Sequence, residues 1–392
     1  MNKSILNIEI QDFINSNLNS EVGPLLLKGT NFKAVETREI IEQIEAKKKC
    51  ETKLPTWFKT PNIYYPNKLN IEQTSSELTA TYKSQLVQGQ SLIDITGGFG
   101  VDCYYFSKHI QQITHCEIDN QLSIIVNYNF KQLNASSIVT QAEDGLTYLK
   151  NHNKVFDWIY VDPSRRHETK GKVFFLSDCL PNVPKYLTLL FKRSNNILIK
   201  TSPLLDISAG LSELKQVKCI HVVAVNNEAK ELLWFLEKNY DKPVGVKTVN
   251  LTNQKNETFN FLLNDEPNSE VKFSNPLTYL YEPNAAILKS GAFKSLSKQL
   301  GVAKLHINSH LYTSDELLEF PGRRFMIENV LQFNKKAFKA LGMNKANITT
   351  RNFPETVSQL RKKFKIGDGG NHFLFFTTTG NNEKIVVVCT KV

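Results

Sequence analysis

Acidic residues stand at the predicted ends of several short apolar strands, and the first of them opens a glycine-rich run. The run reads Asp94-Ile95-Thr96-Gly97-Gly98-Phe99-Gly100 and lies between a predicted strand at residues 91–95 and a predicted helix at residues 101–109. Glycine lets the backbone turn tightly and approach a ligand without a Cβ in the way. A helix N-terminus adds N–H donors and a partial positive charge. The pattern predicts a site for a carboxylate or a phosphate.

Two further acids follow the next predicted strands. Glu117 ends the second strand, 17 residues after Gly100, where a carboxylate can accept hydrogen bonds from both hydroxyls of a ribose. Asp119 lies beside it, and capping of the next helix is the better interpretation for that residue, although it stays among the cofactor-binding candidates. Asp144 closes the third strand and has two open roles, which are contact with an adenine amine and capping of a helix.

A fourth acid begins the stretch Asp162-Pro163-Ser164-Arg165-Arg166, which follows a predicted strand at residues 156–161. Open α/β sheets bind ligands at the carboxyl ends of their strands, so Asp162 is expected beside the glycine-rich turn. A proline-stiffened turn there would hold carbonyls and a carboxylate close to a reacting group. The predicted catalytic residues are Asp162, Pro163, Ser164 and Arg165. The predicted cofactor-binding residues are Asp94, Thr96, Gly97, Gly98, Gly100, Glu117, Asp119, Asp144 and Asp162.

The elements that must position these residues alternate between short strands and helices from residue 91 to residue 200, which indicates a parallel sheet covered by helices. Mainly helical patterns precede it, with an extended, aromatic-rich connection at residues 54–65. Two hairpins are expected after it, at residues 219–237 and 246–263, followed by a polar linker at residues 264–274. A smaller α+β region follows, with helices at residues 285–300 and 335–341 and a final strand pair at residues 373–377 and 385–389.

These motifs, in this order, resemble the class I methyltransferases, and Asp162-Pro163-Ser164-Arg165 is similar to the N/D-P-P-Y/F/R motif of nucleic-acid methyltransferases. More narrowly, the chain resembles the bacterial THUMP-like-domain methyltransferases. Short stretches carry this resemblance over most of the chain: residues 65–69, 73–77, 96–102, 281–284, 321–325 and 350–354. The departure is Ser164, which replaces the second proline. Arg165 then stands where base-amine methyltransferases often carry a stacking aromatic residue, and it could stack on a base or hold a phosphate.

The resemblance implies a Rossmann-like fold, S-adenosylmethionine as the cofactor, and an RNA substrate. It implies an N-terminal helical region at residues 1–88, a Rossmann-like methyltransferase domain at residues 89–264, a ferredoxin-like segment at residues 275–328 and a THUMP-like segment at residues 329–392. By analogy with a helical motif in related enzymes, Gln73 would border the amino-acid end of the cofactor. A residue that merely starts a helix is the slightly favoured alternative for Gln73.

Charge also favours a polyanionic partner. The formal net charge is +10, and residues 330–366 carry nine basic residues and one acid, Glu355. A merely basic protein is an equal alternative on charge alone. Within that segment the basic residues are Lys335, Lys336, Lys339, Lys345, Arg351, Arg361, Lys362, Lys363 and Lys365.

Cysteine and histidine usage argues against several other classes of protein. No two of the six cysteines form a C-x-x-C pair, and His306 and His310 lack further ligands nearby, so no metal site is expected. The start of the chain lacks the apolar core of a signal peptide, and no stretch reaches the length of a membrane span. A cytoplasmic protein without membrane contact is expected. The oligomeric state stays open.

Methylation of a nitrogen in an RNA base is the favoured reaction. Carbon methylation needs a cysteine nucleophile, and the residues after the fifth strand, Lys200-Thr201-Ser202-Pro203, contain none. Two alternatives remain, namely a non-catalytic RNA-binding protein with a methyltransferase fold and a small-molecule methyltransferase. NAD-dependent redox chemistry is more distant, because Asp162-Pro163-Ser164-Arg165 has no role in it.

Overall fold

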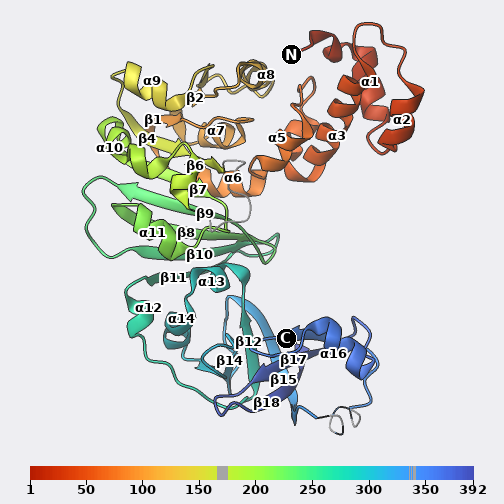
Figure 1. Ribbon diagram of the computed structural model, residues 1–392, viewed down its shortest axis with the longest axis vertical. Helices are drawn as coiled ribbons and strands as arrows, with labels where there is room; N and C mark the ends of the chain where they lie inside the picture. The colour runs from red at the N-terminus through yellow and green to blue at the C-terminus, as the bar shows by residue number, and fades with distance from the viewer. Residues whose placement is uncertain (166–174, 335, 337, 339–340) are drawn as a thin grey trace. The chain divides into compact units, whose positions relative to one another are not determined.

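The structure is a computed structural model, and it describes residues 1–165, 175–334, 336, 338 and 341–392. The chain divides into two compact units (Figure 1). The first unit contains Met1–Val217 and Leu233–Tyr240, and the second contains Lys218–Leu232 and Asp241–Val392.

The first unit begins with short helices. They are η1 (Lys3–Leu6), α1 (Ile8–Ser16), α2 (Val22–Lys28), α3 (Thr37–Lys53), α4 (Pro55–Lys59), α5 (Lys68–Gln73) and α6 (Glu77–Ser84). In α3 the buried residues Ile40, Ile41 and Ile44 recur at helical spacing, so one apolar face covers the core. The prediction of an extended connection at residues 54–65 was wrong in part. Pro55 occupies the first turn of α4, where its missing N–H removes no intrahelical hydrogen bond.

A parallel sheet follows these helices in the first unit. Its strands are β1 (Gly89–Asp94), β2 (Ile110–Cys116), β3 (Ile138–Gln141), β4 (Phe156–Val161) and β7 (Ser194–Thr201). Strand β1 pairs in parallel with β2 and β4, β2 pairs with β3, and β4 pairs with β7. Parallel strands end at the same edge of a sheet, so the acids that follow β1, β2 and β4 come together there. The prediction of a Rossmann-like sheet is confirmed.

Helices flank this sheet (Figure 1). They are α7 (Val101–Phe106), α8 (Asn120–Gln132), α9 (Gly145–Asn151), η3 (Leu176–Asp178), α10 (Val183–Arg193) and α11 (Ile207–Glu213). In α10 the buried residues Val183, Leu187, Leu190 and Phe191 lie on one face at helical spacing. This spacing gives α10 an apolar face toward the core and leaves its lysines in solvent.

The two predicted hairpin regions are present. Strand β8 (Val217–Val225) is connected to β9 (Glu228–Glu237) by Asn226 and Asn227, which have φ values of 49° and 65°. Asparagine tolerates this left-handed conformation, and a two-residue hairpin turn requires it. Strands β10 (Gly245–Leu251) and β11 (Glu257–Leu262) pair antiparallel, and β10 pairs in parallel with β8. Among the described residues the sheet order is β11-β10-β8-β9-β7-β4-β1-β2-β3.

A second sheet lies wholly in the second unit. Its described strands follow the order β13-β14-β12-β15-β18-β17-β16. Their bounds are β12 (Tyr279–Pro283), β13 (Ala303–Lys304), β14 (Tyr312–Ser314), β15 (Gly322–Gln332), β16 (Asn347–Thr350), β17 (His372–Thr378) and β18 (Lys384–Lys391). The helices of this unit are α12 (Asp265–Asn268), α13 (Ala285–Ser290), α14 (Phe293–Leu300) and α16 (Val357–Phe364). One apolar cluster packs around Phe325 and Phe375, and a second around Phe338 and Phe376.

Two expectations for the second unit need correction. The single helix expected at residues 285–300 is two helices, because Gly291 at φ 75° ends α13 in the left-handed conformation. The linker expected at residues 264–274 contains the short helix α12. The helix expected at residues 335–341 lies in large part outside the described residues.

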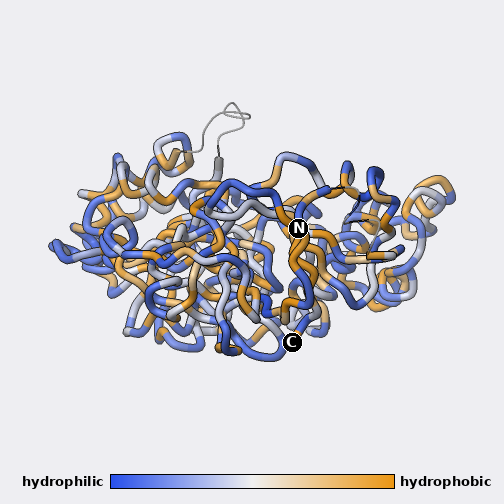
Figure 2. Tube along the Cα trace, turned by 90° about the horizontal axis from the view of Figure 1, so that it is seen from below, coloured by the Kyte–Doolittle hydropathy of each residue, from blue (hydrophilic) through white to orange (hydrophobic). Residues whose placement is uncertain are grey.

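Apolar and hydrophilic stretches alternate along the described part of the chain (Figure 2). This alternation is typical of strands and helices that bury one side. Within the described ranges, the helices are all too short or too polar to traverse a lipid bilayer.

A buried ion pair fixes the last N-terminal helix to the sheet. The Lys83 side chain on α6 is fully buried, and its Nζ lies 3.2 Å from Asp102 Oδ1 on α7. The hydroxyls of Ser75 and Tyr160 donate to Asp102 Oδ2 at 2.9 and 2.7 Å. Burial alone would raise the pKa of Asp102, but the charges of Lys83 and Lys200 and these two donors lower it below its usual value.

Replacement of Lys83 by methionine would leave the Asp102 charge buried without its counter-ion. We expect Lys83→Met to lower the free energy of unfolding by about 3–5 kcal/mol, measured by urea denaturation. The matched control is Arg38→Met, which removes an exposed pair with Glu42 on α3 and should cost less than about 0.5 kcal/mol. Equal losses in the two variants would contradict the role of the buried pair.

Candidate functional site

The glycines of the turn between β1 and α7 differ in the space around them. A Cβ on Gly97 would lie 2.5 Å from the carbonyl oxygen of Cys116 on β2, and one on Gly100 would lie 2.5 Å from the ring of Phe130. Both glycines are therefore required by the packing of the protein itself. Gly98 differs, because at φ 60° its Cβ position has Thr96 O as its nearest neighbour, at 3.9 Å. Gly98 thus offers open backbone to a ligand.

Glu117 points at this turn. Its Oε2 accepts a hydrogen bond from the Gly98 N–H at 2.7 Å, and its Oε1 accepts one from the Asp119 N–H at 2.8 Å. The side chain is half-buried, and burial raises its pKa above the usual glutamate value. A carboxylate has about four lone-pair sites, so Glu117 keeps acceptor capacity after these two bonds. The structure therefore brings the acid at the end of β2 to the glycine-rich turn.

Asp94 acts within the protein and not at its surface, since its side chain is only 2% exposed. Its Oδ1 accepts hydrogen bonds from the N–H and the hydroxyl of Thr96, both at 2.9 Å. The Thr96 hydroxyl oxygen in turn accepts the Asp162 N–H at 2.8 Å. Burial raises the pKa of Asp94 to about 7. This relay fixes the loop after β1 to the loop after β4.

Asp162 forms an ion pair with Lys200 on β7. The side chains of Asp162 and Lys200 are 35% and 12% exposed, so the carboxylate is partly open to solvent while the lysine is mostly buried. Pro163 is buried and Ser164 is exposed. Ser164–Arg165 form the short strand β5, which pairs antiparallel with β6 (Cys179–Leu180). Arg166, the last residue of the motif, lies outside the described residues.

The other predicted site residues cap or end helices. Asp119 Oδ1 accepts hydrogen bonds from the Gln121 and Leu122 N–H groups at the start of α8. Asp144 Oδ1 accepts from the Thr147 N–H at 2.8 Å and from its hydroxyl at 2.9 Å at the start of α9. Gln73 is exposed at the end of α5. Capping is thus seen for both aspartates, and it leaves their second carboxylate oxygens unused by these bonds.

Sequence reasoning missed the cations of this site. Lys200 lies near the carboxyl end of β7, the fifth parallel strand, as Asp94 lies at the carboxyl end of β1. This position in the predicted strand was the signal that could have identified it. Lys53 Nζ donates to the carbonyls of Ile71 and Glu72, and burial together with the nearby Lys200 charge lowers its pKa to about 8. Lys53 and Lys83 come from helices outside the sheet, so strand positions could not reveal them.

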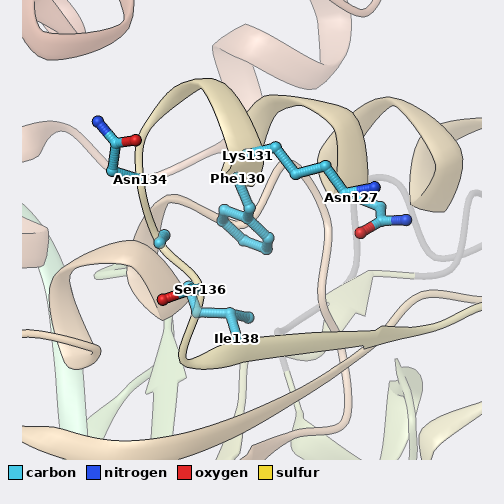
Figure 3. A pocket seen from close by; sticks show the side chains of 7 residues that line it. Asn127, Phe130, Lys131, Asn134, Ser136 and Ile138 are labelled. Atoms are coloured by element: carbon cyan, nitrogen blue, oxygen red, sulfur yellow. The ribbon is translucent and has the colours of Figure 1, made fainter.

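The cavity in Figure 3 is a different place. It has a volume of about 480 Å³ and is lined by the end of α8 and the start of β3, including Phe130, Asn134 and Ile138. The start of β3 lies at the edge of the sheet opposite the strand ends that carry Asp94 and Glu117, because β2 and β3 are parallel. Among the described residues that line this cavity, none is a predicted site residue, although Phe130 both lines it and packs against Gly100.

The histidines considered as metal ligands have other partners. His306 Nδ1 lies 2.9 Å from Asn352 Nδ2, and the ring of His310 stacks on Phe293 at 3.6 Å. Within the part of the chain that the structure describes, no three His, Cys, Asp or Glu side chains gather around a point suited to a metal ion.

Three basic residues of the predicted basic segment, residues 330–366, form ion pairs. Arg361 pairs with Asp368, Lys363 pairs with Glu355, and Arg351 pairs with Glu282. Lys345, Lys362 and Lys365 are exposed. Lys335 and Lys339 lie outside the described residues.

Comparison with known proteins agrees with this architecture. Residues 279–321 match a family described as a ferredoxin-like domain, and residues 322–391 match one described as THUMP domain-like. A search of curated proteins gave no match.

Solved structures extend the comparison to the whole chain. A "putative methyltransferase" from Porphyromonas gingivalis W83 is 30% identical, covers 100% of this chain and 99% of its own, and superposes with a TM-score of 0.89. A "putative methyltransferase" from Escherichia coli is 16% identical over 42% of this chain and 85% of its own, with a TM-score of 0.31. An rRNA methylase from Streptococcus thermophilus is 12% identical over 41% of this chain and 94% of its own, with a TM-score of 0.30. On the full-length match and the two domain matches, the chain belongs to the bacterial THUMP-like-domain family of class I S-adenosylmethionine-dependent methyltransferases.

Proposed function

We propose that this protein transfers a methyl group from S-adenosylmethionine to a nitrogen of an RNA base. The observation that carries the proposal is the contact between Glu117 and the Gly98 N–H, which sets a ribose-binding carboxylate against an open glycine turn. The Asp94–Thr96–Asp162 relay connects this turn to the loop that would hold the substrate.

The residues present fit the cofactor. Gly98 leaves room that a Cβ would fill, and Glu117 retains acceptor capacity for the ribose hydroxyls. We assign to the second carboxylate oxygen of Asp144 the acceptance of a hydrogen bond from the adenine amine, while Gly97, Gly100, Thr96 and Asp94 shape the turn. When bound, S-adenosylmethionine supplies a methyl group that its sulfonium already activates.

The chain's own part in the reaction is alignment. We assign to Asp162 the acceptance of an N–H hydrogen bond from the base, which orients the nitrogen lone pair. Lys200 positions that carboxylate through the ion pair. Pro163 stiffens the turn, and Ser164 and Arg165 continue it as the short strand β5.

Three observations support an RNA base and a nitrogen target. The formal net charge of +10 and the THUMP domain-like match suit a polyanionic partner. Five cysteines are buried and Cys219 is half-buried, which disfavours the exposed thiolate that carbon methylation needs.

The ribose contact can be tested with Glu117→Gln. This change keeps an acceptor for the Gly98 N–H but removes the charge, and charged hydrogen bonds contribute about 1.5–3 kcal/mol. We expect the Kd for S-adenosylmethionine in calorimetry to rise roughly 10- to 150-fold. Glu51→Gln, which alters an exposed pair with Lys48, is the control and should leave the Kd unchanged. A Kd for Glu117→Gln equal to the control would refute the ribose contact.

The buried carboxyl of Asp94 predicts a pH dependence. Its pKa of about 7 in the cofactor-free protein means that it is half protonated at neutral pH. A cofactor with net positive charge favours the ionised form, so binding releases a proton and affinity falls as the pH drops through 7. Between pH 8 and pH 6 the Kd should rise by up to about tenfold. Asp94→Asn removes this titration, and a wild-type Kd that is flat over the same range would contradict the assignment.

Methyl transfer itself can be tested with Asp162→Ala. We expect the variant to bind S-adenosylmethionine but to lose roughly 100-fold or more in methylation of total RNA from cells that lack the protein. Mass spectrometry of nucleosides from these cells should show one methylated nucleoside missing. An unchanged nucleoside profile together with normal cofactor binding would favour a small-molecule methyltransferase. Failure of the wild-type protein to bind S-adenosylmethionine would favour a non-catalytic RNA-binding protein.

A further inference from the structure

A buried carboxylate in the second unit holds two arginines at once. Glu282 on β12 is 3% exposed, and it is the register partner of Arg323 on β15. Arg323 Nε donates to Glu282 Oε2 at 2.7 Å, and Arg351 Nη2 lies 2.7 Å from Glu282 Oε1. Arg351 comes directly after β16, so three separate segments meet at one carboxylate.

The cluster carries one more positive charge than its own acid neutralises. Both guanidinium-bearing side chains remain about one-third exposed, at 37% for Arg323 and 35% for Arg351. Each guanidinium has five N–H donors, and the carboxylate can accept only some of them. Among the described residues, Arg323 Nη1 makes no hydrogen bond within the protein. Within the described part of the chain, Arg351 Nε is buried without a hydrogen-bond partner, so the cluster combines unused donors with a surplus of positive charge on two partly exposed side chains.

The two arginines are also held in fixed directions. The Arg323 guanidinium lies over the Phe325 ring at 5.5 Å, and its Nη2 contacts Thr349 Oγ1 at 3.4 Å. Arg351 Nη1 donates to the carbonyl of Thr350 at 3.3 Å. A pre-oriented guanidinium loses less side-chain entropy when it binds an anion than a free surface lysine does. Lys362 and Lys365 near the end of α16, in contrast, are exposed lysines.

We propose that Arg323 and Arg351, positioned by Glu282, form a binding site for a backbone phosphate of the RNA substrate. Guanidinium groups match phosphate oxygens in a planar, two-point geometry that an ammonium cannot reproduce. Because both groups converge on one carboxylate, they lie close together, and the N–H donors that Glu282 does not take up are available for the oxygens of one phosphate. This inference rests on the proposed RNA substrate and names residues of the second unit that would bind it.

The test is binding of a fluorescein-labelled 12-nucleotide oligouridylate to the full-length chain, followed by anisotropy between 50 and 200 mM salt. We expect Arg323→Gln and Arg351→Gln each to weaken binding roughly threefold to tenfold and to reduce the salt slope by about 0.7, the value for one lost single-strand phosphate contact. The matched control is Arg324→Gln on the same strand, which removes the same charge from a pair with the exposed Glu319. It should change the Kd less than twofold.

A second variant separates a built site from general charge. Glu282→Gln makes the chain more positive, so non-specific attraction would tighten RNA binding. If Glu282 positions Arg323 and Arg351, the same change weakens RNA binding. Arg323→Lys keeps the charge and should restore only part of the affinity that Arg323→Gln loses. Urea denaturation of each variant reports whether it is folded. Equal effects of Arg323→Gln, Arg351→Gln and Arg324→Gln, or tighter binding by Glu282→Gln, would overturn the inference.

The outcomes also separate this inference from the proposed function. If the wild-type protein binds S-adenosylmethionine but neither binds oligouridylate nor methylates RNA, the RNA substrate itself is wrong. If it binds and methylates RNA while the arginine variants behave like Arg324→Gln, only the phosphate site is wrong.

Discussion

The close approach of the glycine-rich turn to β2 is the constraint on which the site depends. Gly97 lies so near the Cys116 carbonyl that any side chain there would collide with backbone. Because the turn is held against the end of β2, the next residue along the turn comes within hydrogen-bonding distance of Glu117. The absence of a side chain at Gly97 thus sets the distance between the glycine-rich turn and the end of β2.

A chain of hydrogen bonds transmits this placement to the fourth strand. Asp94 orients Thr96, and Thr96 accepts the Asp162 N–H, so the loops after β1 and β4 cannot shift independently. Two ion pairs complete the arrangement. Lys200 pairs with Asp162, and Lys83 pairs with Asp102, which sits two residues after the last glycine of the turn. These two ion pairs place a lysine against each of the acids Asp162 and Asp102.

Local sequence signals were sufficient for the sheet and for the acids at its edge. Strand–turn–helix patterns predicted β1, β2 and β4, and the structure brings Asp94, Glu117 and Asp162 to the same edge of the sheet. Pairings between distant segments could not be predicted in this way. Lys83 and Asp102, or Glu282 and Arg351, meet only because separate elements pack together, and no spacing rule connects them. The break at Gly291 was missed because apolar spacing continues across it.

The helices before β1 are part of the same folding problem as the sheet. A protein that started at β1 would keep Asp102 in an apolar interior and lose both the ammonium and the Ser75 hydroxyl that face it. The N-terminal region thus supplies the counter-ion of Asp102 on α7. A shortened form of this protein would have to keep α6 together with the sheet to retain that ion pair.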